Sequence, residues 1–478
     1  GHLPADSGHD GGKTLMSAAL AGLMWAFSFP TFGRSSLAWL APGCLLLAAL
    51  CGGGRGAFKL GYLAGLAHSL ISLHWLLHIP FPAGAIAGWV ALSAYLALYP
   101  ATWLWFCATV LLRSPQAASE AESSVRGVAS PGKARPPFMA GLGPLLDLTW
   151  CQRTVWCLAC ASAWVAFEMV MGRFLTGFPW NFLGVSQYQA LPLIQVASVT
   201  GVYGVSFLVV WCSGALLCAG ACLARAVSQS KSEASRLPLV SFRFTLASDL
   251  ALPLLAVVAI TVGGSRRLAS LPQARPELRV AVVQPSIPQK LIFDPHESTN
   301  RFNRIMELSR LALAAKPDLL VWPEASLPGF EEGHFRELTN LIASHRVWMI
   351  FGADDAESVP EVAGGSPYRY FNSAFLFDPE GRFVATYRKR RLVIFGEYIP
   401  LERWLPFTKH LTPTEGSFTP GPGPVWFQLD RPSARVAPLI CFEDVFAASA
   451  LEAVDAETDF LLNLTNNGWF GESAAQWQ

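Results

Sequence analysis

The sequence predicts a multi-span α-helical membrane domain followed by an α/β domain, and three observations lead to this fold class. The chain has 478 residues, of which 52% are hydrophobic and only 14% charged, whereas charged residues make up about 25% of an ordinary soluble domain. The mean hydropathy is +0.36. Long apolar stretches end near residue 267, and alternating strand-like and helix-like patterns begin at Leu278.

The first domain, residues 14–267, contains apolar stretches that we expect to cross a membrane, because about 20 helical residues span the hydrocarbon layer. Pro100 predicts a kink in the fourth stretch, since proline lacks the N–H that a helix interior needs. A polar tail, residues 1–13, precedes the domain, and residues 113–138 read as a disordered cytoplasmic loop. The seven stretches are about 14–32, 36–53, 57–79, 84–112, 154–172, 191–224 and 248–265.

The loops between these stretches predict an orientation, because cytoplasmic loops are enriched in Lys and Arg. If the N-terminus lies inside, the outer loops carry only Arg34 and Arg173. An odd number of spans then delivers the chain after about residue 268 to the outer face, which is the periplasmic side of a bacterial inner membrane. The inner loops carry Arg55, Lys59, Arg113, Arg126, Lys133, Arg135, Arg225, Lys231, Arg236 and Arg243.

Charge and cysteine usage exclude several function classes. The net charge is +1 and no dense basic tract is present, so we expect no nucleic-acid partner. Nine of the ten cysteines lie between Cys44 and Cys222, within the apolar half. None forms a Cys-x-x-Cys pair accompanied by histidine, and we therefore expect no metal site and no cofactor.

The second domain, residues 268–478, alternates strands with helices, which predicts an α/β domain whose sheets are covered by helices. A hairpin is expected where residues 373–377 and 382–387 flank the turn Asp378-Pro-Glu-Gly381. Helices are expected over residues 297–315, 335–346 and 448–454, and the remaining strands over 278–284, 318–322, 348–352, 436–441 and 459–463.

Three positions in this domain carry residue types suited to catalysis, and each also has a structural interpretation. Cys441 ends a strand-like run and is the one cysteine after Cys222, so it is a candidate nucleophile or a buried structural thiol. Glu324 follows a buried strand and could be a base or a solvated acid. Lys389 lies in a basic run that could instead be a surface patch for anionic headgroups.

Together the three residues form a chemically complete set. Glu324 could take the proton of the thiol as Cys441 attacks a carbonyl carbon. The ammonium of Lys389 could stabilise the resulting oxyanion and, as a neighbouring cation, lower the pKa of the thiol. Glu397 could orient that lysine or shuttle protons, although a structural ion-pair network would use the same residue types.

The order of these motifs resembles a known superfamily. Pro-Glu324-Ala is followed by Tyr-x-Lys389, by Leu-Val-x-Phe-Gly-Glu397 and by Cys441-x-Glu443, which is similar to the nitrilase, or carbon–nitrogen hydrolase, superfamily with its Glu–Lys–Cys triad. The membrane half resembles one branch of it, the bacterial apolipoprotein N-acyltransferases. The segments that carry this second resemblance are 94–99, 175–180 and 466–471.

The resemblance implies a fold and a set of roles. The α/β domain would be a nitrilase-like αββα sandwich. Glu324 would be the general base, Lys389 the oxyanion-stabilising lysine and Cys441 the nucleophile that becomes a thioester. The supporting residues would be the acids Glu397 and Glu443 and a site-shaping asparagine, Asn372.

The implied reaction is ping-pong transfer in lipoprotein maturation. A phospholipid donor acylates Cys441, and the α-amino group of a diacylglyceryl-cysteine at an apolipoprotein N-terminus accepts the chain. The partners would be these two substrates and membrane lipids. Two alternatives remain open, a membrane-tethered amidase in which water accepts the acyl group and a non-catalytic lipid-binding relative.

Further expectations concern individual segments. Residues 398–412 form an aromatic loop that could dip into the headgroup region as a lid or pack on its own domain. Glu168 is expected to pair with Arg173 rather than to line a lipid path. Arg391, Ile394 and Asn467 depart from the family pattern, and the family continues beyond Gln478 with a helix, strands and a final span. The catalytic domain is therefore expected to be truncated.

Overall fold

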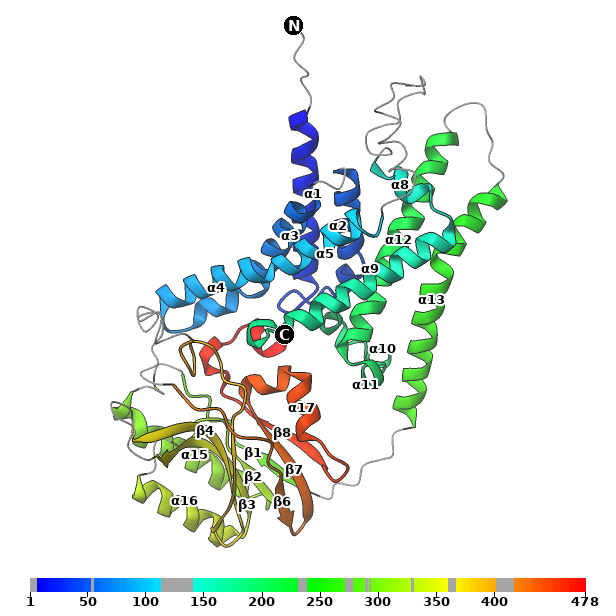
Figure 1. Ribbon diagram of the computed structural model, residues 1–478. Helices are drawn as coiled ribbons and strands as arrows, with labels where there is room; N and C mark the ends of the chain where they lie inside the picture. The colour runs from blue at the N-terminus through cyan, green and yellow to red at the C-terminus, as the bar shows by residue number, and fades with distance from the viewer. Residues whose placement is uncertain are drawn as a thin grey trace. The chain divides into compact units, whose positions relative to one another are not determined.

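Figure 1 shows a computed structural model of the chain, which divides into two compact units that are described separately. One unit comprises Gly1–Trp75, Gly88–Pro272 and Ser473–Gln478, and the other Leu76–Ala87 and Gln273–Glu472. The predicted boundary at residue 268 stays a prediction. The structure describes residues 7–52, 56–112, 141–230, 239–270, 278–288, 291, 294–327, 331–359, 367–400 and 417–478.

Helices occupy all seven apolar stretches of the first unit. Among the described residues, four helical segments are long and apolar enough to cross a membrane: Pro82–Thr109, Trp150–Met171, Val202–Ser228 and Ser248–Ala269. The total of seven spans stays a prediction. The helices are α1 (Ser7–Phe27), α2 (Ala41–Cys51), α3 (Ala57–Ser72), α4 (Pro82–Leu96), α5 (Leu98–Thr109), α8 (Gly143–Leu146), α9 (Trp150–Met171), α10 (Leu191–Ile194), α11 (Ala197–Thr200), α12 (Val202–Ser230) and α13 (Leu239–Ala269).

Two stretches are interrupted for identifiable reasons. The fourth breaks at Ala97, between α4 and α5, close to the kink predicted at Pro100. Because proline has no N–H, the carbonyl of Leu96 loses its partner one turn later. The sixth forms more than one helix, since Gly201 adopts φ +64° and separates α11 from α12. The expected loop 113–138 lies outside the described residues, and α1 begins at Ser7, inside the expected tail.

Small residues let the helices of this unit approach one another closely. A Cβ added to Gly61 of α3 would lie 2.6 Å from the carbonyl oxygen of Pro100 in α5, and one added to Gly22 of α1 would lie 2.3 Å from that of Ala64. Such contacts between small residues are the usual basis of helix packing in membranes, where hydrophobic burial gives no advantage. The glycine and alanine content of the N-terminal half therefore serves packing.

Two buried acids of this unit are held by specific partners. Asp249 of α13 binds Arg153 of α9, whose Nη2 lies 2.9 Å from Oδ2, and the two side chains are 2% and 6% exposed. Glu168 accepts hydrogen bonds from Trp164 Nε1 at 2.9 Å and from the backbone N–H of Leu183 at 2.8 Å. The expected pair with Arg173 is wrong, because that guanidinium donates instead to the carbonyl of Met169 at 3.0 Å.

The Arg153–Asp249 pair gives a test of packing in the helical unit. Asp249→Leu should lower the free energy of unfolding by about 3 kcal/mol, because it leaves a buried guanidinium without a counter-charge. Thermal unfolding of the full chain in detergent measures the loss. The double variant Arg153→Met with Asp249→Leu should recover most of it, and a double variant less stable than the single one would contradict the interpretation.

The second unit contains two sheets. The first has the order β1 (Val280–Val282), β2 (Leu319–Val321), β3 (Trp348–Ser358), β4 (Tyr368–Phe377) and β5 (Phe383–Arg388). Its first three strands are parallel, and β4 and β5 continue antiparallel. The second sheet contains β6 (Phe427–Asp430), β7 (Ser433–Ile440) and β8 (Phe460–Leu464), with β7 antiparallel to β6 and parallel to β8.

Alternation of side chains along the strands builds three apolar layers. Phe351 of β3 packs with α15 (Ser298–Leu313) and α16 (Glu332–His345), whereas the adjacent Ile350 packs with Phe427 and Val436 of the second sheet. On the far face of that sheet, Leu439 packs with Ala453 of α17 (Ala447–Ala453). The order helix, sheet, sheet, helix (Figure 1) is the predicted αββα sandwich.

The elements of this unit match the predicted pattern with two corrections. The expected hairpin forms as β4 and β5, and the three expected helices are α15, α16 and α17. Strand β3 continues to Ser358, six residues beyond its expected end, and β6 was not predicted. Most of the expected lid loop 398–412 lies outside the described residues.

Candidate functional site

The three candidate catalytic residues lie at the ends of three strands. Glu324 follows β2, Lys389 comes directly after β5, and Cys441 comes directly after β7. Lys389 is 1% exposed and Glu324 is 7% exposed, while Cys441 is partly buried. The Nζ atom of Lys389 lies 3.3 Å from Oε1 of Glu324. The structure thus brings together residues that are distant in the sequence, since Glu324 and Cys441 are 117 positions apart.

The ammonium of Lys389 is held between two carboxylates. In addition to Glu324, it binds Oε1 of Glu397 at 2.8 Å. Burial alone would lower the pKa of Lys389, but Glu324, the Cys441 thiol and Glu397 outweigh burial and raise that pKa well above its ordinary value. The lysine is therefore a fixed positive charge at neutral pH and not a base.

Asn372 of β4 orients both carboxylates. Its Nδ2 donates to Oε1 of Glu324 at 2.8 Å and to Oε1 of Glu397 at 2.7 Å. The second oxygen of each acid accepts from the backbone, at 3.2 Å from the N–H of Asn466 for Glu324 and at 2.8 Å from that of Val393 for Glu397. Each carboxylate is thus fixed at both oxygens.

The backbone at Cys441 is strained. The residue adopts φ +53°, in the left-handed region that non-glycine residues seldom occupy, at a cost on the order of 1–3 kcal/mol. Strand β7 ends there and passes into a tight turn, Cys441–Val445. Asn463 of β8 supports the turn by donating from Nδ2 to the carbonyl of Cys441 at 3.1 Å. Such strain is typical of functional positions.

The thiol of Cys441 rests in its protonated form. Burial raises its pKa, Glu324 and Glu397 raise it further, and Lys389 and a hydrogen bond with Thr465 lower it, with a net value of about 12. The predicted lowering of this thiol's pKa by Lys389 is confirmed, but burial and the two carboxylates outweigh it. The thiol consequently needs a base at the moment of attack.

Glu443 is fully buried and acts as a clamp between segments. One oxygen accepts from the backbone N–H groups of Arg390 at 2.8 Å and Arg391 at 3.0 Å, directly after Lys389. The other accepts from Ile440 N at 2.9 Å, directly before Cys441, and from the hydroxyl of Tyr387 at 2.7 Å. This carboxylate therefore fixes the lysine-bearing and cysteine-bearing segments to each other.

Sequence reasoning missed several of these contributors. Tyr387 stands in the Tyr-x-Lys motif, but only the fold places its hydroxyl against Glu443. Thr465 and the backbone of Asn466 follow β8 and reach Cys441 and Glu324. Asp354 lies beyond the expected end of β3 at residue 352, and in the structure it belongs to β3 and is opposite Asn372.

The assembled groups can perform acyl transfer at a carbonyl carbon. They provide a nucleophile, a carboxylate that can take its proton and a fixed cation for the oxyanion. Among the described residues, no group of three or more His, Cys, Asp and Glu side chains is placed to hold a metal ion.

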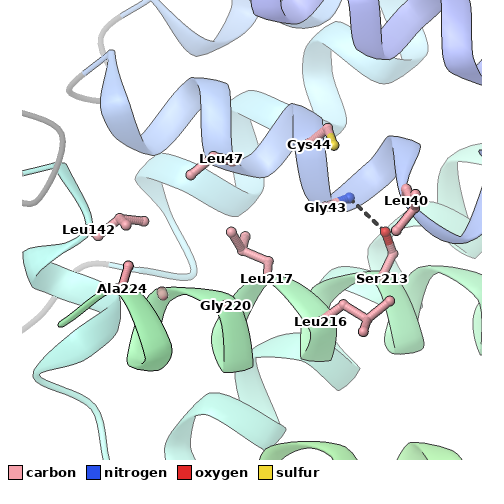
Figure 2. Close-up of a pocket in the computed structure, with 11 residues that line it drawn as sticks. Leu40, Gly43, Cys44, Leu47, Leu142, Ser213, Leu216, Leu217, Gly220 and Ala224 are labelled. Atoms are coloured by element: carbon pink, nitrogen blue, oxygen red, sulfur yellow. Dashed lines mark hydrogen bonds between the residues drawn. The ribbon is translucent and has the colours of Figure 1, made fainter. Parts of the chain in front are cut away.

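A separate cavity of about 300 Å³ lies in the helical unit between α2 and α12 (Figure 2). Its walls are apolar, from Leu47 on one helix and Leu217 on the other, and a hydrogen bond joins the backbone N–H of Gly43 to the hydroxyl of Ser213 at 2.8 Å. It contains no acid and no basic side chain. This cavity is suited to apolar contacts and not to the chemistry described above.

Comparison with known proteins first defines the class. Residues 279–478 match the family model described as carbon–nitrogen hydrolase, and residues 21–215 match the apolipoprotein N-acyltransferase N-terminal domain. With its apolar helices, the chain is a membrane protein with a carbon–nitrogen hydrolase domain.

Named relatives then give the particular family. The apolipoprotein N-acyltransferase of Geobacter metallireducens is 32% identical over 477 residues, which cover 98% of this chain and 80% of that protein. That of Rickettsia typhi is 29% identical and that of Bradyrhizobium diazoefficiens 30% identical, and the matched regions cover 58% and 60% of those proteins. The chain belongs to the apolipoprotein N-acyltransferase family of acyltransferases.

A solved amidase from Nesterenkonia sp. is also similar. It is 16% identical, with 40% of this chain and 66% of that chain covered and a TM-score of 0.29. The family assignment does not depend on this likeness.

The Glu443 clamp can be tested by exchanging one oxygen for an amide nitrogen. In Glu443→Gln an amide NH₂ group, which is a donor, faces N–H or O–H groups that need an acceptor. About two hydrogen bonds to a charged group are therefore lost, at roughly 1.5–3 kcal/mol each. The unfolding temperature should fall by roughly 5–10 °C, and the rate of acyl transfer should fall with it.

The matched control for this change is Asp430→Asn, an exposed acid at the end of β6. It should leave the unfolding temperature within about 1 °C, as for most surface substitutions. Equal unfolding temperatures for Glu443→Gln and the unaltered protein would contradict the clamp.

Proposed function

We propose that this chain is an N-acyltransferase that moves an acyl chain from a phospholipid to the α-amino group of a diacylglyceryl-cysteine at an apolipoprotein N-terminus, through a thioester on Cys441. The observation that carries the proposal is the proximity of Glu324 and the buried Lys389 ammonium to a strained cysteine that rests as a thiol. The names of the relatives support the acceptor class.

In the first half-reaction, Sγ of Cys441 attacks the ester carbonyl carbon of the phospholipid while Glu324 takes the thiol proton. The Lys389 ammonium stabilises the oxyanion, since its charge is already fixed and needs no reorganisation. Collapse of the intermediate breaks the carbon–oxygen bond. The lysophospholipid leaves with the proton from Glu324, and the acyl chain remains on sulfur.

In the second half-reaction, the neutral α-amino group attacks the thioester carbonyl carbon. Glu324 takes a proton from the attacking nitrogen, and Lys389 again stabilises the oxyanion. Collapse breaks the carbon–sulfur bond, and the proton held by Glu324 returns to Cys441. The products are an amide on the acceptor and the resting thiol.

The other site residues support these steps without bonding to the substrate carbon. Asn372 and Glu397 hold the base and the ammonium in place, and Glu443 holds the two backbone segments. Burial and the neighbouring Glu443 carboxylate raise the pKa of Tyr387, so its hydroxyl stays a donor. These residues are positioning groups.

The proposed location is the inner membrane of a bacterium, with the catalytic domain on the periplasmic side. The support is the concentration of Lys and Arg in alternate loops of the helical half. A phospholipid and a lipid-modified cysteine are both held in the membrane, so a catalytic domain attached to membrane helices meets them without extracting either.

A membrane-tethered amidase is the second candidate, because the match of residues 279–478 is to a carbon–nitrogen hydrolase model. In that case water would attack the thioester. The match of residues 21–215 to an N-acyltransferase domain favours transfer to an amine.

The test supplies detergent-solubilised protein with phospholipid and a diacylglyceryl-cysteinyl peptide, and it follows the peptide by mass spectrometry. We expect an added acyl mass on the α-nitrogen, and at least a thousandfold lower rate for Cys441→Ser. Free fatty acid without acylated peptide would establish the amidase instead. Neither product would establish a non-catalytic protein.

A further inference from the structure

One carboxylate beside the candidate site has no assigned role. Asp354 of β3 lies directly opposite Asn372 of β4 in the antiparallel register, and directly opposite residues share one face of a sheet. Asn372 uses that face to reach Glu324 and Glu397. The same alternation places Asp355 on the other face, where it pairs with Arg388 at 2.7 Å.

Asp354 differs from the other acids of the site in being open to solvent. Within the described ranges, no hydrogen bond or ion pair engages its carboxylate, whereas Glu324 and Glu397 are each held at both oxygens. It is therefore free to bind a group that arrives from outside.

Among the described residues, no cation is paired with the carboxylate of Asp354. Although its side chain reaches solvent, the protein packed around Asp354 disfavours the charged form and raises its pKa, and Glu324 and Glu397 raise it further, to about 6. Lys389 is the cation held by those two acids. Together with Asp354, these acids make three carboxylates for one ammonium. Arg388, which directly precedes Lys389, binds Asp355 and Glu357 instead.

The excess of negative charge around Asp354 suits only one of the two substrates. An α-amino group is largely protonated at neutral pH, since its ordinary pKa is about 7.7–8.0, and so the acceptor arrives with a positive charge next to its reacting atom. The ester group of the donor is neutral. A solvent-open carboxylate near Glu324 and Glu397 therefore distinguishes the second half-reaction from the first.

We propose that Asp354 binds the α-ammonium group of the acceptor before that group is deprotonated, and so determines acceptor affinity. This inference rests on the proposed acyl transfer and adds a specificity residue to it. The charged groups that act on Asp354 are Glu324 and Glu397, and both of these acids are paired with Lys389. The bound ammonium then loses its proton to solvent, and the neutral amine attacks the thioester.

The proposal predicts a pH dependence with a defined sign. Only the ionised carboxylate binds an ammonium, so acceptor affinity should be gained as pH rises through about 6, the pKa of Asp354. The gain should be absent from a variant that lacks the carboxylate. Added salt should weaken acceptor binding in the unaltered protein, because exposed charges are screened.

The experiment measures the two half-reactions separately with the variant Asp354→Asn. The donor is a phosphatidylglycerol, whose head group has no ammonium, and the thioester on Cys441 is followed by intact-protein mass. The acceptor is a diacylglyceryl-cysteinyl peptide. We expect the acceptor KM to rise about tenfold, the scale of one hydrogen bond to a charged group, with loss of its pH and salt dependence, while the acylation rate changes less than threefold.

Matched variants separate binding from folding. Glu357→Gln alters an acid on the same strand but on the opposite face, and Arg388 keeps its pair with Asp355, so both half-reactions should be retained. Asp354→Glu should restore part of the acceptor affinity. Asp354→Ser is a second neutral variant and should reproduce Asp354→Asn.

Two results would overturn the inference. One is an acceptor KM in both neutral variants equal to that of the unaltered protein. The other is an equal fall in the rates of both half-reactions, which would make Asp354 part of the acylation chemistry. Failure of the unaltered protein to form a thioester is a different outcome, because it would refute the proposed function and the inference with it.

Discussion

The arrangement of the α/β unit depends on an ammonium group that is almost completely removed from water. Transfer of such a charge into a protein interior costs several kcal/mol unless paired groups offset it. Lys389 is 1% exposed and has two carboxylates within ion-pairing distance. Both acids must therefore stay in place, and Asn372, the N–H of Val393 and the N–H of Asn466 hold them there.

The same constraint explains why the cysteine rests as a thiol. A site with two fixed carboxylates and one ammonium does not favour a further negative charge on sulfur, and burial opposes it as well. The proton therefore has to leave as the carbon–sulfur bond forms, and Glu324 is the acid in the proposed role of accepting it.

Much of this could be predicted from the sequence, because it is encoded locally. Apolar stretches and alternating patterns located the helices and strands, and the spacing of Glu324, Lys389 and Cys441 within recognisable motifs indicated a common site. What could not be predicted depends on strand register and on the combined electrostatic effect of several charged groups. The partners of Glu443 come from two distant segments, the position of Asp354 depends on where β3 ends, and the pKa of Cys441 is a balance of opposing charges. The break at Gly201 was also not predicted, whereas the one at Ala97 lies close to the kink predicted at Pro100.

The most direct test of the account is the intact mass of the detergent-solubilised protein after incubation with phospholipid alone, without an acceptor. The account predicts one added acyl chain that hydroxylamine removes, located on Cys441 by peptide mapping, and a strongly reduced rate of addition in Glu324→Gln. An adduct that persists in Cys441→Ala, or no adduct on the unaltered protein, would contradict it.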